Sequence, residues 1–478
     1  MYLPRSQTVS QMFGVGKEVD VLLCQPPLSL RMKYRDQEPE VIRYFDAMNG
    51  NADPLNGDNP FEPNNGLLML AGNLRAAGLT VQVLDFNIYD IRVRETSGEP
   101  ISLDDIEQVI KRYRYRLLGI SLMCISERYV KPFCEISRSH LPNAKVVFGG
   151  LLPRAVPQLL TERYPFVDKF ISSAAELEII ELLKDTDGRR SVASRPADRA
   201  FDFVPADVPF IPRVVTASKQ CRHACAFCSP VYDRIRNGDH EYGDTASEIE
   251  RIRLSYGADF FLIGNLSLLS TEQDKFVCRR LGEWDHKISY WCQMRLEDVT
   301  PENVDILQRS GCIQVAVGIE TENAITRRNV KHARTASNGV HELRLLKSAG
   351  ISTYGYFIIG CPGDTRADAL RTIGLIDSLL ADGLLDATHL SVPVAYPGTP
   401  WFESPERFGL RIKHHNFSDY WMNCDPLGYG MPMLDTDTLR AEAIYELWKT
   451  ALVVTADRVA GQFSDHRRLF NRLTRIAA

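Results

Sequence analysis

Three cysteines within eight residues constrain this chain more than any other feature of its sequence. Cys221, Cys225 and Cys228 follow the spacing Cys-x3-Cys-x2-Cys. Thiolates at this spacing suit three irons of a cubane cluster and leave the fourth iron without a protein ligand. The alternatives are a zinc site or three unrelated core cysteines, but zinc prefers a fourth ligand at finger-like spacing, and His223 lies inside the loop. The spacing therefore indicates a [4Fe–4S] cluster whose open iron binds a small molecule.

Composition limits the possible partners. The 478 residues are enough for two or three domains, and a net charge of -5 gives no electrostatic footprint for nucleic acid or an anionic membrane. No apolar run approaches the ~18 residues of a membrane span. The eleven cysteines form no secreted-type framework, which favours a reducing compartment. We therefore expect a cytoplasmic protein that acts on a small molecule, without nucleic-acid or membrane partners.

The first part of the chain alternates between short apolar runs and helical patterns. The expected strands are 19–25, 80–85, 117–123 and 144–149. This alternation predicts an α/β domain over residues 18–185, with a doubly wound parallel sheet that binds ligands at the carboxyl ends of its strands. Residues 1–17 form an N-terminal tail. The polar segment from Arg31 to Asn65 is expected to be an insertion rather than a core element.

A second series of strands and helices begins after a linker at residues 186–209. The expected strands are 210–217, 259–264, 288–295, 313–319, 353–360 and 388–394. Periodicity alone allows a barrel of six or eight units. The cysteine loop follows the first strand directly, which places it at the carboxyl face of the barrel, where such folds carry their chemistry. Residues 406–478 are expected to form a lid with a helix from Asp437 to about Gly461.

The cysteine triplet, with Phe227 before its last cysteine, resembles the radical S-adenosylmethionine (radical SAM) superfamily. In that family the open iron binds the methionine moiety of SAM, and the reduced cluster generates a 5′-deoxyadenosyl radical. The resemblance covers residues 18 to about 405. It implies a partial (β/α)6 barrel over 210–405, a helical C-terminal segment over 406–478, SAM as a cofactor, and an external one-electron reductant of the flavodoxin type.

The ends of the barrel strands match the SAM-binding motifs of the family. Gly264-Asn265 takes the place of the motif for the methionine amino group, without its usual acidic residue, and Arg295 suits the methionine carboxylate. Gly318-Ile-Glu-Thr321 matches Gly-Ile-Glu-Ser, and the stretch that ends at Gly360 resembles the motif that packs on adenine. The resemblance implies these cofactor-binding residues: Phe227, Gly264, Asn265, Arg295, Gly318, Glu320, Ile358 and Gly360.

The first domain resembles the cobalamin-binding domain that precedes many radical SAM barrels. Ser121 and Met123 match its Ser-x-Leu, and Gly149-Gly150 match its glycine pair. Two departures from the family pattern argue against bound cobalamin. The first strand is not followed by Asp-x-His-x-x-Gly, so the sequence lacks the histidine that would be a lower ligand of cobalt. In addition, Ser173-Ala-Ala-Glu176 replaces the usual Gly-Glu-Gly-Glu. A cobalamin site and a vestigial scaffold are both compatible with this sequence.

Two reactions fit the resemblance. The first is hydrogen abstraction and dehydration of a polyhydroxylated, aminoglycoside-like substrate, as in the diol dehydratase of apramycin-type pathways. The second is cobalamin-dependent radical methylation. The missing histidine and the altered loop favour dehydration, which predicts SAM cleavage without cobalamin. Dehydration needs a general acid and a way to quench the final radical. The candidates on the carboxyl side of the barrel are His389, Tyr396, Cys361 and Asp425. His389 is also compatible with a core histidine.

Overall fold

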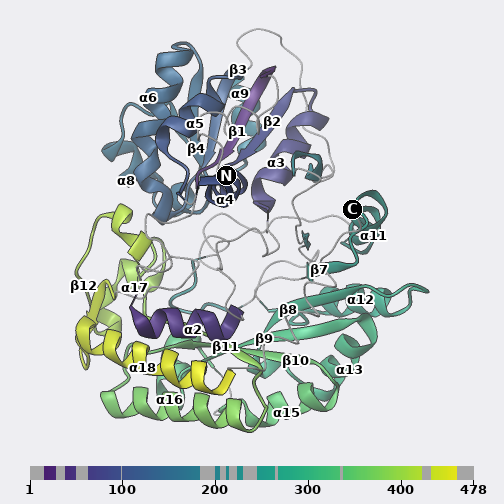
Figure 1. The fold of residues 1–478 in the computed structure, drawn as a ribbon, viewed down its shortest axis with the longest axis vertical. Coiled ribbons are helices and arrows are strands. Elements are labelled where there is room, and N and C mark those ends of the chain that lie inside the picture. The colour runs from purple at the N-terminus through teal and green to yellow at the C-terminus, as the bar shows by residue number, and fades with distance from the viewer. Residues whose placement is uncertain are drawn as a thin grey trace.

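Two parallel sheets, one above the other, organise the computed structural model of the chain (Figure 1). The structure describes residues 16–27, 38–49, 63–97, 99–183, 200–204, 212–214, 223–229, 245–263, 267–333, 337–422 and 432–459. Four of the expected site residues lie outside the described residues: Cys221, Gly264, Asn265 and Asp425.

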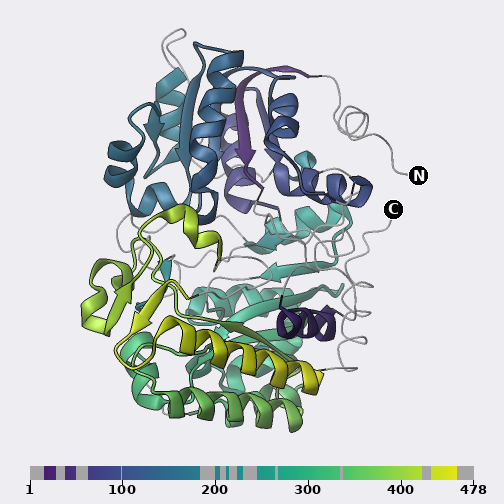
Figure 2. The same ribbon diagram turned by 60° about the vertical axis from the view of Figure 1, so that its left-hand side comes forward.

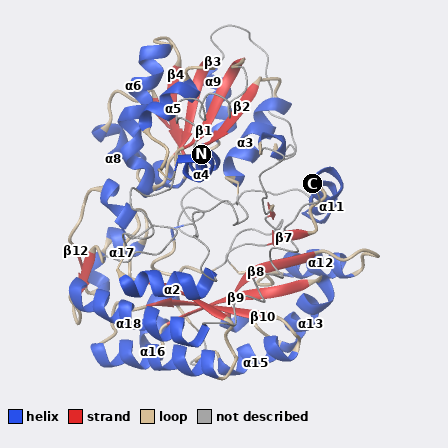
Figure 3. Cartoon of the chain, viewed as in Figure 1, coloured by secondary structure: helices blue, strands red, loops and turns tan. Residues whose placement is uncertain are grey.

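The first sheet has five parallel strands in the order β2-β1-β3-β4-β5. They are β1 (Glu18–Gln25), β2 (Val81–Asp85), β3 (Arg114–Ser121), β4 (Lys145–Gly149) and β5 (Lys169–Phe170). The main helices around them are α3 (Asn65–Ala76), α4 (Phe86–Ser97), α5 (Leu103–Ile110), α6 (Val130–His140) and α9 (Ala175–Leu183). Leu23 shares a core with α3 and α9, whereas Leu22 shares a core with α5 and α6. Apolar side chains thus pack on both faces of the sheet. Helices cover these faces (Figure 3), which confirms the expected doubly wound fold.

The second sheet has six parallel strands that follow the order of the chain. They are β6 (Arg213–Val214), β7 (Phe260–Ile263), β8 (Ser289–Arg295), β9 (Cys312–Glu320), β10 (Ser352–Ile358) and β11 (Ala387–Ser391). The helices that cover them include α11 (Thr245–Tyr256), α12 (Glu272–Gly282), α13 (Pro301–Ser310), α14 (Ala324–Lys331), α15 (Val340–Ser348) and α16 (Arg366–Ala381). The first and last strands do not pair within the described residues, so the expected partial barrel of six units is confirmed.

Three barrel helices begin with the same kind of cap. Thr271, Thr300 and Thr365 precede α12, α13 and α16, and each accepts a hydrogen bond from the backbone N–H three residues further on. This contact satisfies a donor that the start of a helix leaves without an intrahelical partner. The loops at the carboxyl ends of the strands are therefore tied to fixed helix starts.

Helix α2 (Pro39–Asn49) belongs to the first domain in sequence but packs on the barrel (Figure 2). It lies against α18 (Ala441–Val459), and the Tyr44 hydroxyl donates to the carbonyl of Thr388 over 2.6 Å. Thr388 lies on the edge strand β11, whose outer backbone groups need partners when they are buried. The expectation that residues 31–65 lie outside the core is therefore wrong for α2, because this helix covers the open edge of the barrel.

The C-terminal segment connects the two domains. The strands β12 (Leu410–Ile412) and β13 (Leu434–Thr436) pair antiparallel, and η6 (Phe417–Met422) between them packs against η2 (Cys124–Tyr129) of the first domain. The helix expected near Asp437 is α18. Among the described residues, no helix combines the length and the apolar character that crossing a membrane requires.

Candidate active site

The carboxyl ends of the two sheets face each other. Ser121 ends β3, and the chain then enters η2, which packs against η6. The Tyr420 hydroxyl of η6 donates to the carbonyl of Ala395, just past the end of β11, over 2.8 Å. Elsewhere along the contact, the side-chain amide of Asn65 donates to the carbonyl of Arg213 in β6, also over 2.8 Å. A ligand at the edge of one sheet therefore lies opposite a ligand at the edge of the other.

The cysteine loop lies on the C-terminal end of α14. The N–H of Ala226 donates to the carbonyl of Val330 over 2.7 Å, and the N–H of Cys228 donates to the carbonyl of Cys225 over 3.0 Å. These bonds hold the turn that carries both described cysteines. Phe227 packs its ring 5.5 Å from that of Trp401. The thiol donors and the fixed turn suit an iron–sulfur cluster, because thiolates are the usual ligands of such clusters.

Arg295 connects the end of β8 to the cysteine loop. Its side chain is 4% exposed, and its Nε lies 2.8 Å from a carboxylate oxygen of Glu297. Its Nη1 donates to Cys225 Sγ over 3.2 Å, and its Nη2 donates to the carbonyl of Lys331 over 3.0 Å. The guanidinium therefore contacts one of the cysteines that are expected to bind the cluster. Its expected contact with the methionine carboxylate of SAM remains a prediction.

Glu320 ends β9 in an unusual backbone conformation. Its φ is +67°, a region that non-glycine residues rarely adopt. Its carboxylate lies 2.8 Å from Lys331 Nζ, and both side chains are buried. A Cβ at Gly318 would lie 2.5 Å from each of these charged atoms, so a larger residue there would displace the ends of both side chains. Sequence reasoning identified Gly318 and Glu320 but missed Lys331, because this residue reaches the site only through the fold of α14.

The end of β10 packs behind the cysteine loop. Ile358 and Cys361 share an apolar cluster with Ala226, and burial raises the pKa of the Cys361 thiol. A Cβ at Gly360 would lie 2.9 Å from the side chain of Ile444 in α18. This glycine therefore allows α18 to pack closely. Its expected contact with adenine is not tested by this geometry.

The three described catalytic candidates have different surroundings. Cys361 is fully buried beside the cysteine loop. The His389 ring lies 5.6 Å from that of Tyr356 inside the barrel, and burial lowers the pKa of His389. The Tyr396 ring lies 6.3 Å from that of Tyr420, where the domains meet. Their catalytic roles remain predictions.

The carboxyl edge of the first sheet offers a place for a bulky cofactor. Asn64 donates from Nδ2 to Ser121 Oγ over 3.1 Å and also to Gln25 Oε1, so these polar groups lie together at the ends of β1 and β3. At the neighbouring end of β4, a Cβ at Gly150 would lie 2.9 Å from the Leu122 carbonyl, so this glycine lets the ends of β3 and β4 pack closely, whereas Gly149 leaves its backbone uncrowded. Polar groups beside bare backbone suit the approach of a large ligand. These residues therefore fit cobalamin, whose binding the sequence alone neither requires nor excludes.

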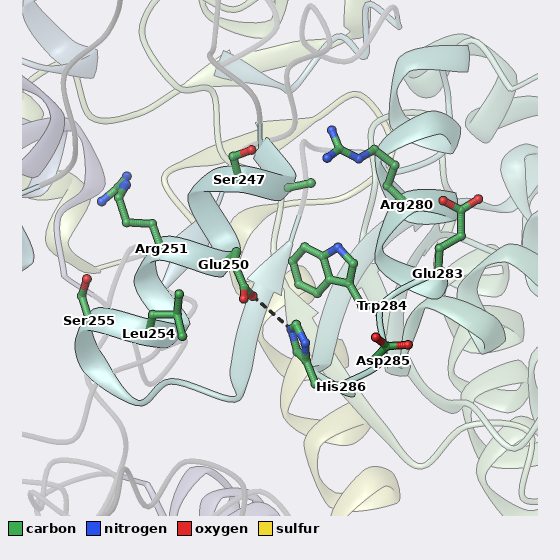
Figure 4. A pocket seen from close by; sticks show the side chains of 11 residues that line it. Ser247, Glu250, Arg251, Leu254, Ser255, Arg280, Glu283, Trp284, Asp285 and His286 are labelled. Atoms are coloured by element: carbon green, nitrogen blue, oxygen red, sulfur yellow. Dashed lines mark ion pairs between the residues drawn. The ribbon is translucent and has the colours of Figure 1, made fainter.

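A surface groove of about 620 Å³ lies away from these strand ends (Figure 4). It is lined by residues of α11, α12 and the turn after α12. The Glu250 carboxylate pairs with His286 Nε2 over 3.0 Å, and the His286 ring lies 4.8 Å from that of Trp284. The groove is on the helical side of the barrel, so it is separate from the candidate active site.

Comparison with protein families identifies both domains. The B12-binding domain model matches residues 60–180, and the radical SAM superfamily model matches residues 215–376. The chain is a radical SAM enzyme with an N-terminal B12-binding domain. The radical SAM domain implies a [4Fe–4S] cluster and SAM. The B12-binding domain supports cobalamin as a third cofactor.

Individual relatives are distant. The chain is 22% identical over 348 residues to a protein of Pyrococcus horikoshii named "Uncharacterized methyltransferase PH0819", covering 66% of this chain and 74% of the relative. It is 20% identical over 377 residues to the anaerobic magnesium-protoporphyrin IX monomethyl ester cyclase of Cereibacter sphaeroides, covering 70% of this chain but only 59% of the cyclase.

Solved structures share the two-domain arrangement. The radical SAM methyltransferase TsrM from Kitasatospora setae, with cobalamin and a [4Fe–4S] cluster bound, matches with a TM-score of 0.61 and 16% identity over 91% of both chains. OxsB, a cobalamin-dependent SAM radical enzyme with aqua-cobalamin and SAM bound, matches with a TM-score of 0.55 and 12% identity over 86% of this chain and 55% of OxsB. At these identities the likeness shows the fold.

One cluster per chain is the first testable prediction of this site. Anaerobic reconstitution is expected to give about four irons and four sulfides per chain, as one cubane requires. Replacing Cys221, Cys225 or Cys228 by serine is expected to abolish the cluster absorbance, whereas Cys124→Ser, at a partly exposed single cysteine, serves as the control. About eight irons, or a protein that binds zinc alone, would contradict the prediction.

Proposed function

We propose that the protein is a cobalamin-dependent radical SAM methyltransferase that acts on an organic small molecule. One observation carries the proposal: the carboxyl ends of the two sheets face each other, with η6 in contact with both sides. When bound, cobalamin carries a methyl group and the cluster with SAM supplies the radical. Transfer between two cofactors and one substrate requires all three to meet in one space, and the facing edges provide that space.

The comparisons favour methylation over the dehydration that the sequence suggests. The names of the Pyrococcus relative and of TsrM both denote methyltransferases, and the TsrM structure contains cobalamin. The missing histidine after Pro26-Pro27 does not remove the polar and glycine-lined edge at Asn64, Ser121 and Gly149. The expected dehydration of an aminoglycoside-like substrate has no support among these relatives.

The chain's own residues have separate tasks in this proposal. Arg295 holds Cys225 and the end of α14 in one arrangement. Lys331 holds the Glu320 carboxylate beside Gly318. In this proposal that carboxylate accepts a hydrogen bond from SAM. The turn of the cysteine loop fixes two thiols. An external one-electron reductant of the flavodoxin type is the proposed protein partner.

Formation of S-adenosylhomocysteine tests the proposal without a known substrate. Protein reconstituted with its cluster and loaded with cob(I)alamin is expected to convert SAM to S-adenosylhomocysteine in proportion to the bound cobalamin, as measured by mass spectrometry. Once a substrate is found, its product should be heavier by one methylene. Cleavage to 5′-deoxyadenosine alone, unaffected by cobalamin and accompanied by a product lighter by one water, would establish dehydration instead.

A further inference from the structure

The inner faces of the barrel strands decide which molecules fit inside. Along β8 to β11 alternate residues point outward, and side chains such as Val315 and Phe357 pack in the core with the helices. The opposite set includes Gln293, Tyr354, Tyr356 and His389, which we call the lumen layer. Tyr356 lies opposite His389 in the pairing of β10 and β11. Gln293 and Tyr354 both lie opposite the small Ala316 of β9, from its two neighbouring strands.

The lumen layer is aromatic. The Tyr356 ring lies 5.5 Å from that of Tyr354 and 5.6 Å from that of His389, and both pairs are tilted edge-to-face. Gln293 Nε2 donates to the Tyr356 hydroxyl over 3.0 Å, which fixes the orientation of the central ring. On the side of β7 and β8, Trp291 packs with Phe260 and Leu262 in a separate apolar cluster. Flat apolar surfaces therefore lie on more than one wall of the barrel.

Two polar groups of the lumen layer have no hydrogen-bond partner within the described part of the chain. These are the imidazole of His389 and the hydroxyl of Tyr354. Burial lowers the pKa of His389 and raises the pKa of Tyr354, yet both side chains keep some exposed surface. Both side chains are therefore largely buried without being fully enclosed. A ligand that pairs with them recovers hydrogen bonds that are costly to leave unmade.

The barrel strands carry few groups that could pair with a polycationic substrate. Among the described residues of β7 to β11, Glu320 carries the one carboxylate, and it is already paired with Lys331 over 2.8 Å. Along these strands a substrate with several ammonium groups would find no other carboxylate, and burying unpaired charges is strongly unfavourable. An uncharged ring has no such cost.

We propose that the lumen layer binds a planar aromatic or heteroaromatic ring that bears an N–H or O–H group, and that this ring belongs to the methyl acceptor. The ring packs against Tyr354 and Tyr356, where edge-to-face and offset contacts are favourable. Its polar group pairs with His389 and the Tyr354 hydroxyl. The part of the proposal that names the methyl acceptor rests on the proposed function, whereas binding of the ring does not.

Calorimetry on the reconstituted full chain with SAM, and without reductant, tests the proposal. The probes are indole, 4-methylphenol and, as a polycationic comparison, 2-deoxystreptamine. Both ring compounds are expected to bind, and His389→Phe is expected to weaken them roughly tenfold through loss of one buried hydrogen bond. Tyr354→Phe is expected to have a similar effect. His389→Gln keeps hydrogen-bonding groups and should stay within about threefold of the wild type.

The matched control is His341→Phe, the same substitution at an exposed position on α15, which is expected to leave the affinities unchanged. Circular dichroism of each variant separates loss of binding from loss of fold, and His389→Gln keeps the test valid if His389→Phe misfolds. Tighter binding of 2-deoxystreptamine than of both rings, or unchanged ring affinity in both His389 variants, overturns the proposal. Ring binding with the expected pattern, but no cobalamin-dependent S-adenosylhomocysteine, would refute methylation and leave this inference intact.

Discussion

Replacing Lys331 by methionine is expected to lower the free energy of unfolding by about 3–5 kcal/mol, the usual cost of removing one partner from a buried ion pair. Lys331 Nζ lies 2.8 Å from Glu320 Oε1, and the two side chains are 7% and 9% exposed. Methionine preserves most of the length of the lysine stem but leaves the Glu320 carboxylate and the Gly318 carbonyl without this donor. Urea denaturation of the cluster-free protein measures the loss.

Two controls separate charge from packing in this experiment. The double variant Lys331→Met/Glu320→Gln removes both charges and is expected to recover most of the stability, because a neutral amide is less costly to bury than an unpaired carboxylate. Lys111→Met breaks an ion pair with Glu107 whose side chains are about 40% exposed, and should cost no more than about 1 kcal/mol. If Lys331→Met costs no more than Lys111→Met, the pair is not a buried ion pair in solution.

The strands of both domains were predictable because each buried parallel strand is a short apolar run that stops at glycine, proline or a polar residue. The run at 19–25 ends at Pro26-Pro27, and the corresponding strand ends at Gln25. The order of strands and helices then leaves few possible topologies. The number of barrel strands did not follow from periodicity, which allowed six or eight, and required the resemblance to a known family.

The contacts of the site were less predictable because they depend on tertiary structure. Lys331 reaches Glu320 only because Glu320 adopts a φ of +67° and Gly318 leaves room for both charged groups. The local sequence indicates neither the positive φ of Glu320 nor the space beside Gly318. Helix α2 was misjudged for a similar reason, since its partner is a strand edge more than three hundred residues away, where Tyr44 meets Thr388. The sequence around α2 is rich in polar residues, and it does not indicate what the buried Val41 and Tyr44 of this helix pack against.

Replacing Arg295 by methionine is expected to lower the midpoint potential of the cluster by on the order of 50–100 mV. A hydrogen bond between a cation and the Cys225 sulfur stabilises the reduced cluster more than the oxidised one, because reduction adds negative charge at the sulfurs. Such bonds contribute about 1.5–3 kcal/mol in total, and 1.4 kcal/mol corresponds to ~59 mV for one electron. The expected shift comes from the part of this energy that differs between the reduced and the oxidised cluster. Redox titration followed by electron paramagnetic resonance measures it.

Arg309→Met is the matched control, since Arg309 is 75% exposed and pairs with Asp305 on the same helix. It is expected to leave the potential unchanged.

The measurement also separates two roles for Arg295. If this residue acts on the cluster through Cys225, the potential falls in Arg295→Met even when no SAM is present. If it serves only the methionine carboxylate, as its position at the end of β8 suggests from sequence, SAM affinity falls and the SAM-free potential stays at the wild-type value. A shift in the absence of SAM would therefore assign Arg295 to the cluster, because no other ligand is present to transmit the effect.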